Sequence, residues 1–233
     1  VWALKRTHWR SRQIQKRTPS TADVRREFLA SVRTVLVYVL VSIFVIWGVR
    51  NGVLRKMDGN FGFAGNLLVL VAIIVVHDAY FYWCHRAMHH PRLFKHFHRF
   101  HHRTITPTPW AAYSFAVPEA IVMALFVPLW QYFVPTPGVV IFVFLLIMIV
   151  RNCMGHAGLE LHARGWASHP VLKWISTTTH HDLHHAGSFN HNYGFYFTWW
   201  DKVMGTEHPD YVATYDRVTR PVSDRKALAV EPA

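Results

Sequence analysis

Charged side chains are scarce in this chain of 233 residues, of which they make up only 16%. A water-soluble domain carries roughly 25% charged residues, so the low proportion argues against that class. Acidic residues are the scarcest, with 13 Asp and Glu against 25 Lys and Arg, and the formal net charge is +12. Only two cysteines occur, Cys84 and Cys153, and they form no CxxC pair. A disulfide framework and a zinc ribbon are therefore excluded.

Hydrophobic residues are correspondingly abundant, at 52% of the chain, and aromatic residues make up 15%. They form four apolar runs, which cover residues 32–49, 66–84, 111–134 and 138–150. The third run is interrupted by Pro118, Glu119 and Pro128. A helix of about 20 apolar residues is long enough to cross a bilayer. The sequence therefore predicts an all-α integral membrane protein with about four transmembrane helices, arranged as two hairpins.

Basic residues concentrate around the start of the first apolar run, and this position predicts how the chain is oriented. They are Lys5, Arg6, Arg10, Arg12, Lys16, Arg17, Arg25, Arg26 and Arg33. Such residues mark the cytoplasmic end of a span and favour anionic headgroups, and a nucleic-acid partner is not expected. We expect residues 1–30 to form a basic cytosolic or interfacial segment and residues 31–233 a single membrane-embedded domain. Four spans place both termini in the cytoplasm, together with residues 85–110 and 151–233.

Histidine is the most over-represented residue, with 18 copies, and most of them are clustered. The first cluster has an HxxxH spacing and follows the second apolar run, where a continuing helix would place both rings on one face. Two HxxHH patterns follow, and a further histidine stands just after the fourth run. These nine candidate ligands are His85, His89, His98, His101, His102, His156, His181, His184 and His185. All of them lie in the two stretches that the topology places on one side of the membrane.

Neutral imidazole is the commonest metal-binding side chain, and nine such groups are too many for one zinc ion with four ligands. They suit two metals of five or six coordination, although imidazole binds Zn, Cu, Fe and Ni alike. Three carboxylates stand where they could hydrogen-bond a ligating ring, namely Asp78, Glu160 and Asp182. The sequence leaves open whether four further histidines also bind metal, namely His77, His90, His96 and His180. No catalytic residue is expected beyond the ligands.

Three of these motifs together resemble the fatty acid hydroxylase / sterol desaturase superfamily of membrane di-iron enzymes. They are HRAMH (85–89), HRFHH (98–102) and HDLHH (181–185), and NYGFYFTWWDKVMGT (192–206) resembles the closing segment of that family. The resemblance extends from about Leu67 to Thr206. It implies a four-helix membrane stem under a cytosolic helical cap that holds two irons. The nine histidines are then the iron ligands, with His156 assigned by position rather than by a tight motif.

The resemblance also implies a reaction. Two iron ions, which zinc can replace in purified protein, would use O2 as co-substrate to hydroxylate an unactivated C–H bond of a fatty-acyl, sphingoid, sterol or related lipid. Desaturation of a lipid at the same site is the alternative. The chain contains no GxGxxG loop, no CxxCH haem site and no HPGG signature. We therefore expect electrons to come from a separate protein, of the reductase, ferredoxin or cytochrome b5 type.

Two functions of other classes remain open from the residues alone. A membrane haem electron carrier needs histidines paired across spans, whereas these cluster at the ends of the spans, and it would show a Soret band. A metal transporter needs ionisable residues along several spans, and only His77, Asp78 and Glu119 qualify. A zinc hydrolase is disfavoured because the chain lacks HExxH.

Overall fold

The computed structural model describes residues 1–223 except for residues 2, 56, 58, 60, 188 and 222. In this part of the chain all regular secondary structure is helical, apart from two isolated β-bridges, Gln13 with Leu159 and Ile175 with Phe197. The expected all-α class is therefore confirmed. Residues 224–233, the end of the predicted domain, lie outside the described residues.

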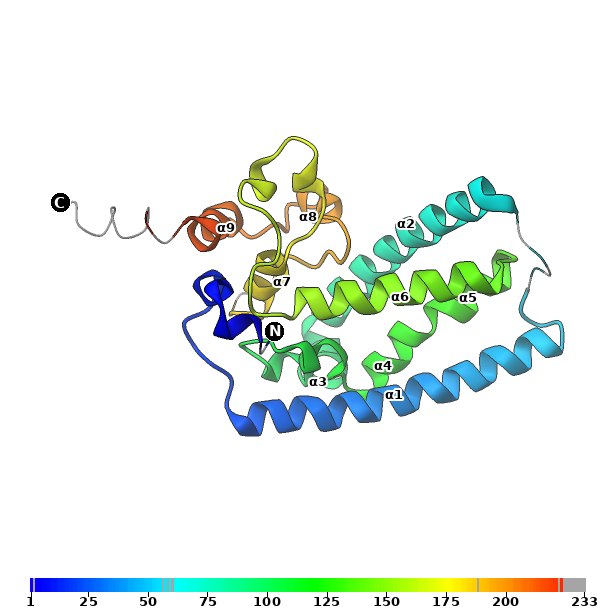
Figure 1. Ribbon diagram of the computed structural model, residues 1–233. Helices are drawn as coiled ribbons and strands as arrows, with labels where there is room; N and C mark the ends of the chain where they lie inside the picture. The colour runs from blue at the N-terminus through cyan, green and yellow to red at the C-terminus, as the bar shows by residue number, and fades with distance from the viewer. Residues whose placement is uncertain are drawn as a thin grey trace.

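The helices form an elongated stem with a smaller cap at one end (Figure 1). The stem consists of α1 (Thr21–Arg50), α2 (Gly62–Met88), α4 (Val117–Ala124), α5 (Phe126–Phe133) and α6 (Gly138–Gly155). The cap contains α3 (Pro91–Phe97), α7 (Thr178–His185), α8 (Trp199–Val203) and α9 (Tyr211–Thr219). Six short 3-10 helices connect these elements, at Leu4–Arg6, His8–Arg12, His101–Arg103, Pro109–Tyr113, Trp166–Ser168 and Leu172–Trp174.

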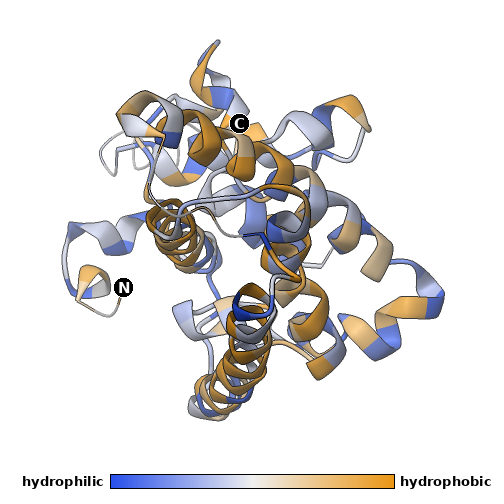
Figure 2. Ribbon diagram, turned by 90° about the vertical axis from the view of Figure 1, so that its right-hand side faces the viewer, coloured by the Kyte–Doolittle hydropathy of each residue, from blue (hydrophilic) through white to orange (hydrophobic). Residues whose placement is uncertain are grey.

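Three stem helices, α1, α2 and α6, are long and apolar enough to cross a membrane. Figure 2 shows these helices orange around most of their circumference, as expected for helices in contact with lipid. Large side chains are exposed along them, including Leu40, Leu68 and Phe142 at 65–71%. The membrane character predicted from composition is thus borne out by the exposed surface of the stem.

The third predicted span differs from the expectation. Residues 111–134 do not form one continuous helix, because Pro109–Tyr113 is a 3-10 turn and the apolar stretch that follows is divided into α4 and α5. Pro118 stands in the first turn of α4, where it is tolerated. Pro128 has no N–H to donate to the carbonyl of Ala124, the last residue of α4, which explains why the helix breaks there. The two halves together still lead from the cap to the far end of the stem (Figure 1).

The first stem helix begins earlier than the apolar run predicted. Ser20 and Asp23 form a capping box in which each side chain accepts the other residue's backbone N–H, so α1 starts at Thr21 and passes through the predicted boundary at residue 30. The segment before it packs against the cap, where Gln13 pairs with Leu159 and the side chain of Ile14 is buried. This arrangement holds the N-terminal residues next to the histidine-bearing segments.

The core of the stem lies where α2, α5 and α6 meet. Ile73, Phe126, Trp130 and Phe144 form one buried cluster there, and α1 packs against α4 and the Pro109–Tyr113 turn. The chain traverses the stem outward in α1, back in α2, outward in α4 and α5, and back in α6 (Figure 1). Both histidine-rich stretches therefore emerge at the cap end, beside the N-terminal segment.

Candidate metal centre

The nine histidines selected from the sequence lie together in the cap, and all of them are at most 9% exposed. They form two groups, and within each group one ligand nitrogen per residue lies within 4.8 Å of every other. The first group is His85, His89, His98, His102 and His184, and the second is His101, His156, His181 and His185. The four histidines left open, at positions 77, 90, 96 and 180, belong to neither group.

Local structure explains how each motif presents its rings. His85 lies in the last turn of α2 and His89 directly follows that helix, before Pro91 begins α3. The second motif is not an α-helix, since His98 caps the end of α3 and His101 and His102 occupy a 3-10 turn. The third motif lies within α7, where the spacing of four residues places His181 and His185 on one face. A turn in the second motif can therefore divide its rings between the two groups.

Backbone carbonyl groups fix the orientation of four rings through Nδ1. A carbonyl oxygen can only accept, so each of these Nδ1 atoms carries the proton and the lone pair lies on Nε2. The Nδ1 atoms are those of His85, His156, His184 and His185, and they donate to the carbonyls of Tyr193 (3.0 Å), Asn152 (2.9 Å), His191 (2.6 Å) and Thr104 (2.8 Å) respectively. The rings are thus held with Nε2 as the donor atom for a metal.

A carboxylate orients a fifth ring. Glu119 in α4 accepts from Nδ1 of His98 over 2.7 Å, and the two side chains are 1% and 3% exposed. The sequence predicted no partnership between Glu119 and a histidine ring, since Glu119 stood out only as an interruption of an apolar run and as an ionisable residue within a span. The signal that could have identified it was the cost of placing a carboxylate there, which marks such a residue as functional by default.

The distances between the inward-facing nitrogens fit a metal ion in each group. Nε2 of His85 lies 3.0 Å from Nε2 of His98, and both of these atoms carry lone pairs because both Nδ1 atoms donate elsewhere. Two lone pairs facing each other repel unless a cation lies between them. Ligands about 2.1 Å from one metal are about 3.0 Å apart at a right angle and about 3.4 Å apart at the tetrahedral angle. The first group therefore has the geometry of a metal site.

The second group has the same spacing. Nε2 of His156 lies 3.0 Å from that of His181 and 3.4 Å from that of His101, and the nitrogens of His181 and His185 are 3.2 Å apart. In the first group, His89 and His102 are likewise 3.2 Å apart. The residues present thus fit a pair of adjacent metal ions with mainly neutral nitrogen ligands.

Burial keeps the rings neutral in the absence of metal. It lowers the pKa of His156 to about 4. Burial, reinforced by the neighbouring imidazoles, holds the pKa well below the usual value of 6.5 for His98, His101, His102, His181, His184 and His185. Neutral imidazole is the form that binds metal, so no proton has to leave these rings at neutral pH before a metal binds.

Asp78, predicted as a possible partner of a histidine ring, makes different contacts. Its carboxylate accepts from the backbone N–H groups of Tyr196 (2.8 Å) and Phe197 (3.2 Å) and from the indole N–H of Trp199 (2.7 Å). Asp78 therefore ties α2 to the chain segment before α8 rather than orienting a ligand. The rings of His85 and His98 are oriented instead by the carbonyl of Tyr193 and the carboxylate of Glu119.

The other two predicted carboxylates also hold parts of the cap rather than a ligating ring. Glu160 accepts from the N–H and hydroxyl of Thr179, at 2.7 and 2.6 Å, and thereby holds the first turn of α7. It also bonds the ring of the nearby His162. Asp182 accepts from the side chain of Gln15 at 2.8 Å, which connects α7 to the N-terminal segment. Both residues position α7, which carries three of the nine histidines.

The closing segment after α7 supplies two of the carbonyl acceptors. Asn192 adopts a left-handed conformation with φ of 58°, and Asp201 in α8 accepts the N–H groups of Tyr193 (2.9 Å) and Gly194 (2.7 Å). This turn aims the carbonyl of Tyr193 at His85. The closing motif therefore orients the His85 ring through its backbone, and His191, directly before the motif, orients the His184 ring.

Comparison with known proteins identifies relatives. The family described as Fatty acid hydroxylase matches residues 70–206. The chain is 31% identical over 63% of its length to Delta(7)-sterol 5(6)-desaturase ERG3B of Gibberella zeae, covering 44% of that protein. It is 29% identical to Delta(7)-sterol 5(6)-desaturase erg3C of Aspergillus fumigatus and 28% identical to lathosterol oxidase of Rattus norvegicus, over 79% and 80% of this chain and 62% of each relative. The chain thus spans less than two thirds of these relatives. No solved structure matches it significantly.

Proposed function

Because the chain belongs to the fatty acid hydroxylase family, we propose that it is a membrane-bound di-iron enzyme that uses O2 to oxidise an unactivated C–H bond of a lipid. The observation that carries this proposal is the pair of buried histidine groups whose Nε2 lone pairs converge. Such an arrangement is not explained by packing, because it brings unpaired acceptors together in the interior.

The ligand assignment follows from the two groups. His85, His89, His98, His102 and His184 would hold one iron, and His101, His156, His181 and His185 the other. Iron is proposed from the family, since imidazole accepts several metals, and zinc could occupy the same nitrogens in purified protein. When bound, the iron pair supplies the activation of O2 and the removal of hydrogen from carbon, which no side chain can perform.

The residues of the chain provide the surroundings of that chemistry. The carbonyls of Tyr193, His191 and Thr104 and the carboxylate of Glu119 keep Nε2 of four rings directed inward, those of His85, His184, His185 and His98. The burial of all nine rings excludes bulk water, which would otherwise consume a strong oxidant. The stem presents apolar surface directly beneath the cap, and we propose that the lipid substrate approaches the centre from this side.

Hydroxylation of a C–H bond by O2 requires two electrons and two protons from outside the substrate. One atom of O2 enters the C–H bond as a hydroxyl group, and the other leaves as water.

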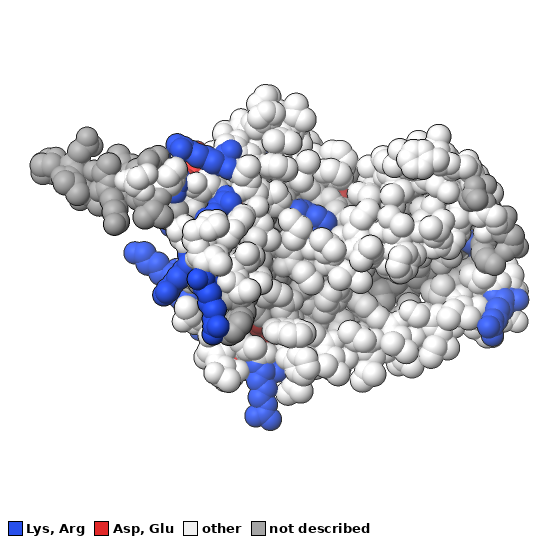
Figure 3. All heavy atoms as spheres, in the orientation of Figure 1, with Lys and Arg blue, Asp and Glu red and all other residues white. Residues whose placement is uncertain are grey.

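The electrons are proposed to come from a separate reductase, ferredoxin or cytochrome b5 type of protein, which would dock at the cap. Figure 3 shows the basic side chains gathered mainly at that end of the molecule, while the stem surface in view is almost free of charge. An acidic donor would complement this face, and the same charge supports our proposal that the cap lies on the cytoplasmic side.

Desaturation is the second candidate, and a specific observation favours it. Two of the similar proteins are named as sterol desaturases and a third as lathosterol oxidase. In desaturation, two hydrogens leave adjacent carbons and both atoms of O2 become water, again with two electrons and two protons. The same metal centre serves either outcome, so the position of the substrate carbons decides between them.

The test combines metal analysis with product analysis of the purified full-length protein. We expect two irons per chain, no Soret band, and a lipid product that has gained one oxygen or lost two hydrogens when cells with and without the chain are compared. His102→Ala should abolish the product and reduce bound iron, while His96→Ala, an exposed histidine outside both groups, should leave both unchanged. One haem per chain, or full activity in His102→Ala, would overturn the proposal.

A further inference from the structure

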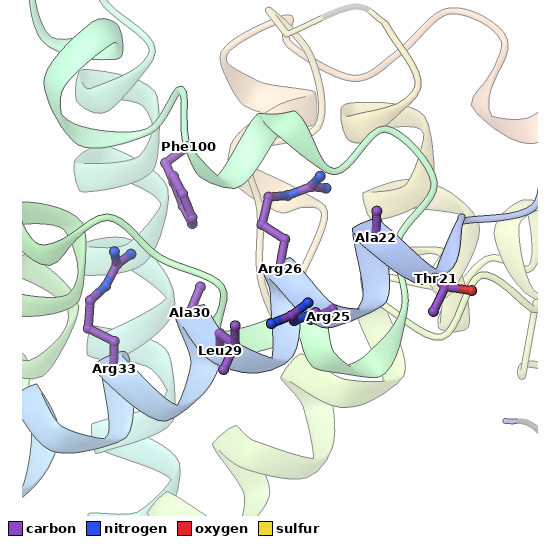
Figure 4. A pocket seen from close by; sticks show the side chains of 8 residues that line it. All are labelled: Thr21, Ala22, Arg25, Arg26, Leu29, Ala30, Arg33 and Phe100. Carbon is purple, nitrogen blue, oxygen red and sulfur yellow. The ribbon is translucent and has the colours of Figure 1, made fainter.

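A groove of about 620 Å³ lies on the outside of the molecule, between the first turns of α1 and the segment that contains Phe100. Its walls include Arg25, Arg26, Leu29 and Arg33 of α1 (Figure 4). The ring of Phe100 projects from the opposite side, between the side chains of Arg26 and Arg33. The volume is in the range of small-molecule binding sites, and neither the histidine groups nor the proposed reaction uses it.

The groove is strongly basic. Three of its eight lining residues are arginine, and none of the described lining residues is acidic. Arg26 pairs with Asp23 at 2.8 Å, and Arg33 bonds the carbonyl of Phe115 and lies 4.9 Å above the ring of Phe100. Arg25 is exposed and forms no ion pair with a described residue. The local charge therefore exceeds what the surrounding side chains neutralise, which favours an anionic ligand.

The position of the groove along α1 indicates where that ligand comes from. Arg33 and Arg50 are 17 residues apart, which is about 26 Å along a helix and close to the roughly 30 Å thickness of the hydrocarbon core. Arg33 therefore stands at one edge of that core, and Arg25 and Arg26 lie beyond it at the depth of the headgroups. The neighbouring Leu29 is 55% exposed and Val32 45% exposed, so apolar surface continues from the groove onto the stem.

We propose that this groove binds the headgroup phosphate of an anionic glycerophospholipid from the surrounding leaflet. A guanidinium group can donate two parallel hydrogen bonds to the oxygens of one phosphate, and Arg25 and Arg33 both line the groove from α1. The acyl chains lie along the exposed apolar face of α1 that contains Leu29 and Val32. Soluble phosphate would lack these apolar contacts, and a zwitterionic lipid would bring a positive charge to the arginines.

The site would connect the membrane to the histidine centre. Phe100 stands between His98 and His101 in the sequence, and the side chain of Arg26 also lies 3.5 Å from the carbonyl of Arg103. A headgroup bound between α1 and this segment would hold the turn that carries His98, His101 and His102. Lipid binding is thus expected to stabilise the cap. This inference does not depend on the oxygenase chemistry.

The experiment uses the full-length protein in neutral detergent, with phosphatidylglycerol, phosphatidylcholine and inorganic phosphate as probes. Native mass spectrometry would count bound lipid, and thermal unfolding would report stability. We expect phosphatidylglycerol to bind and raise the unfolding midpoint, and phosphatidylcholine and phosphate to do neither. Arg25→Gln combined with Arg33→Gln should weaken phosphatidylglycerol binding by about tenfold or more, because both phosphate-binding guanidinium groups are lost.

Two controls keep the result interpretable. Arg10→Gln with Arg92→Gln removes the same charge from exposed residues outside the groove and should leave lipid binding unchanged. Arg25→Gln alone alters a side chain with no ion-pair partner among the described residues, so it should fold normally and still bind more weakly. Equal binding of phosphatidylcholine, a full response to phosphate alone, or equal loss in the Arg10 and Arg92 variant would each overturn the proposal.

Discussion

The contact between Glu119 and His98 gives the sharpest test of the proposed metal centre. Replacing Glu119 by alanine leaves the Nδ1–H of His98 buried without its acceptor, which costs about 1–3 kcal/mol. Loss of such an orienting partner typically weakens metal binding by about 10–100-fold, or about 1.4–2.7 kcal/mol. We expect Glu119→Ala to fall in this range. Glu119→Gln keeps an acceptor oxygen but loses the charge, which contributes roughly half of such a bond, so we expect about a threefold to tenfold loss.

The assay is competition for iron between the purified protein and a chelator of known affinity, followed by metal analysis of the protein fraction. Asp78→Asn is the matched control, since Asp78 is an equally buried carboxylate whose hydrogen bonds go to Tyr196, Phe197 and Trp199 rather than to a histidine. Iron affinity within a factor of about two of the unaltered protein in Glu119→Ala would refute the orienting role, because it lies outside the range expected for such a partner.

Three further outcomes follow from the same geometry. His184→Ala should abolish lipid oxidation and lower the iron content while circular dichroism still reports a helical protein, because the stem does not depend on that ring; full activity would remove His184 from the ligands. Gly194→Ala should destabilise the cap, since a Cβ there would lie 2.8 Å from the Asp201 carboxylate and closer still to the carbonyl of Phe197; an unchanged unfolding midpoint would contradict this. Metal-free protein should lose stability as the pH falls below 6.5, because burial lowers the pKa of the native histidines while unfolded imidazoles take up protons at that pH. At pH 5.5 the loss is about 1.4 kcal/mol for each buried ring, and thermal unfolding in chelator at pH 7.5 and 5.5 would measure it.

The pattern of histidines was sufficient to predict which residues gather in the cap. The two HxxHH spacings and the HxxxH spacing are short-range features, and helical or turn geometry converts each directly into rings on a common side. The apolar runs likewise predicted the stem, because a helix that contacts lipid is apolar on nearly every face. The division into two groups was not predictable, since His101 and His102 are adjacent in sequence yet belong to different groups.

The contacts that orient the rings could not be read from the sequence. Most of the acceptors are backbone carbonyls, such as those of Tyr193 and Thr104, and every residue carries one. Their use depends on which segments the tertiary fold brings together. Pro128 indicated the break in the third apolar run. The length of the run alone predicted a continuous span, because the hydropathy of a segment does not depend on whether a residue has a backbone N–H.

The membership of the two histidine groups has a consequence for the unfolded chain. In the first group, four residues come from positions 85–102 and only His184 comes from α7, whereas in the second His101 alone joins residues 156–185. The first ion would link His102 to His184, 82 residues apart, and the second would link His101 to His156, 55 residues apart, so each would act as a removable cross-link. Closing a loop of that length removes entropy from the unfolded ensemble, and such links stabilise most when the loop is long. Without metal, α7 and the closing segment should separate from the stem first. The amount of bound metal should therefore determine the order in which parts of the cap unfold.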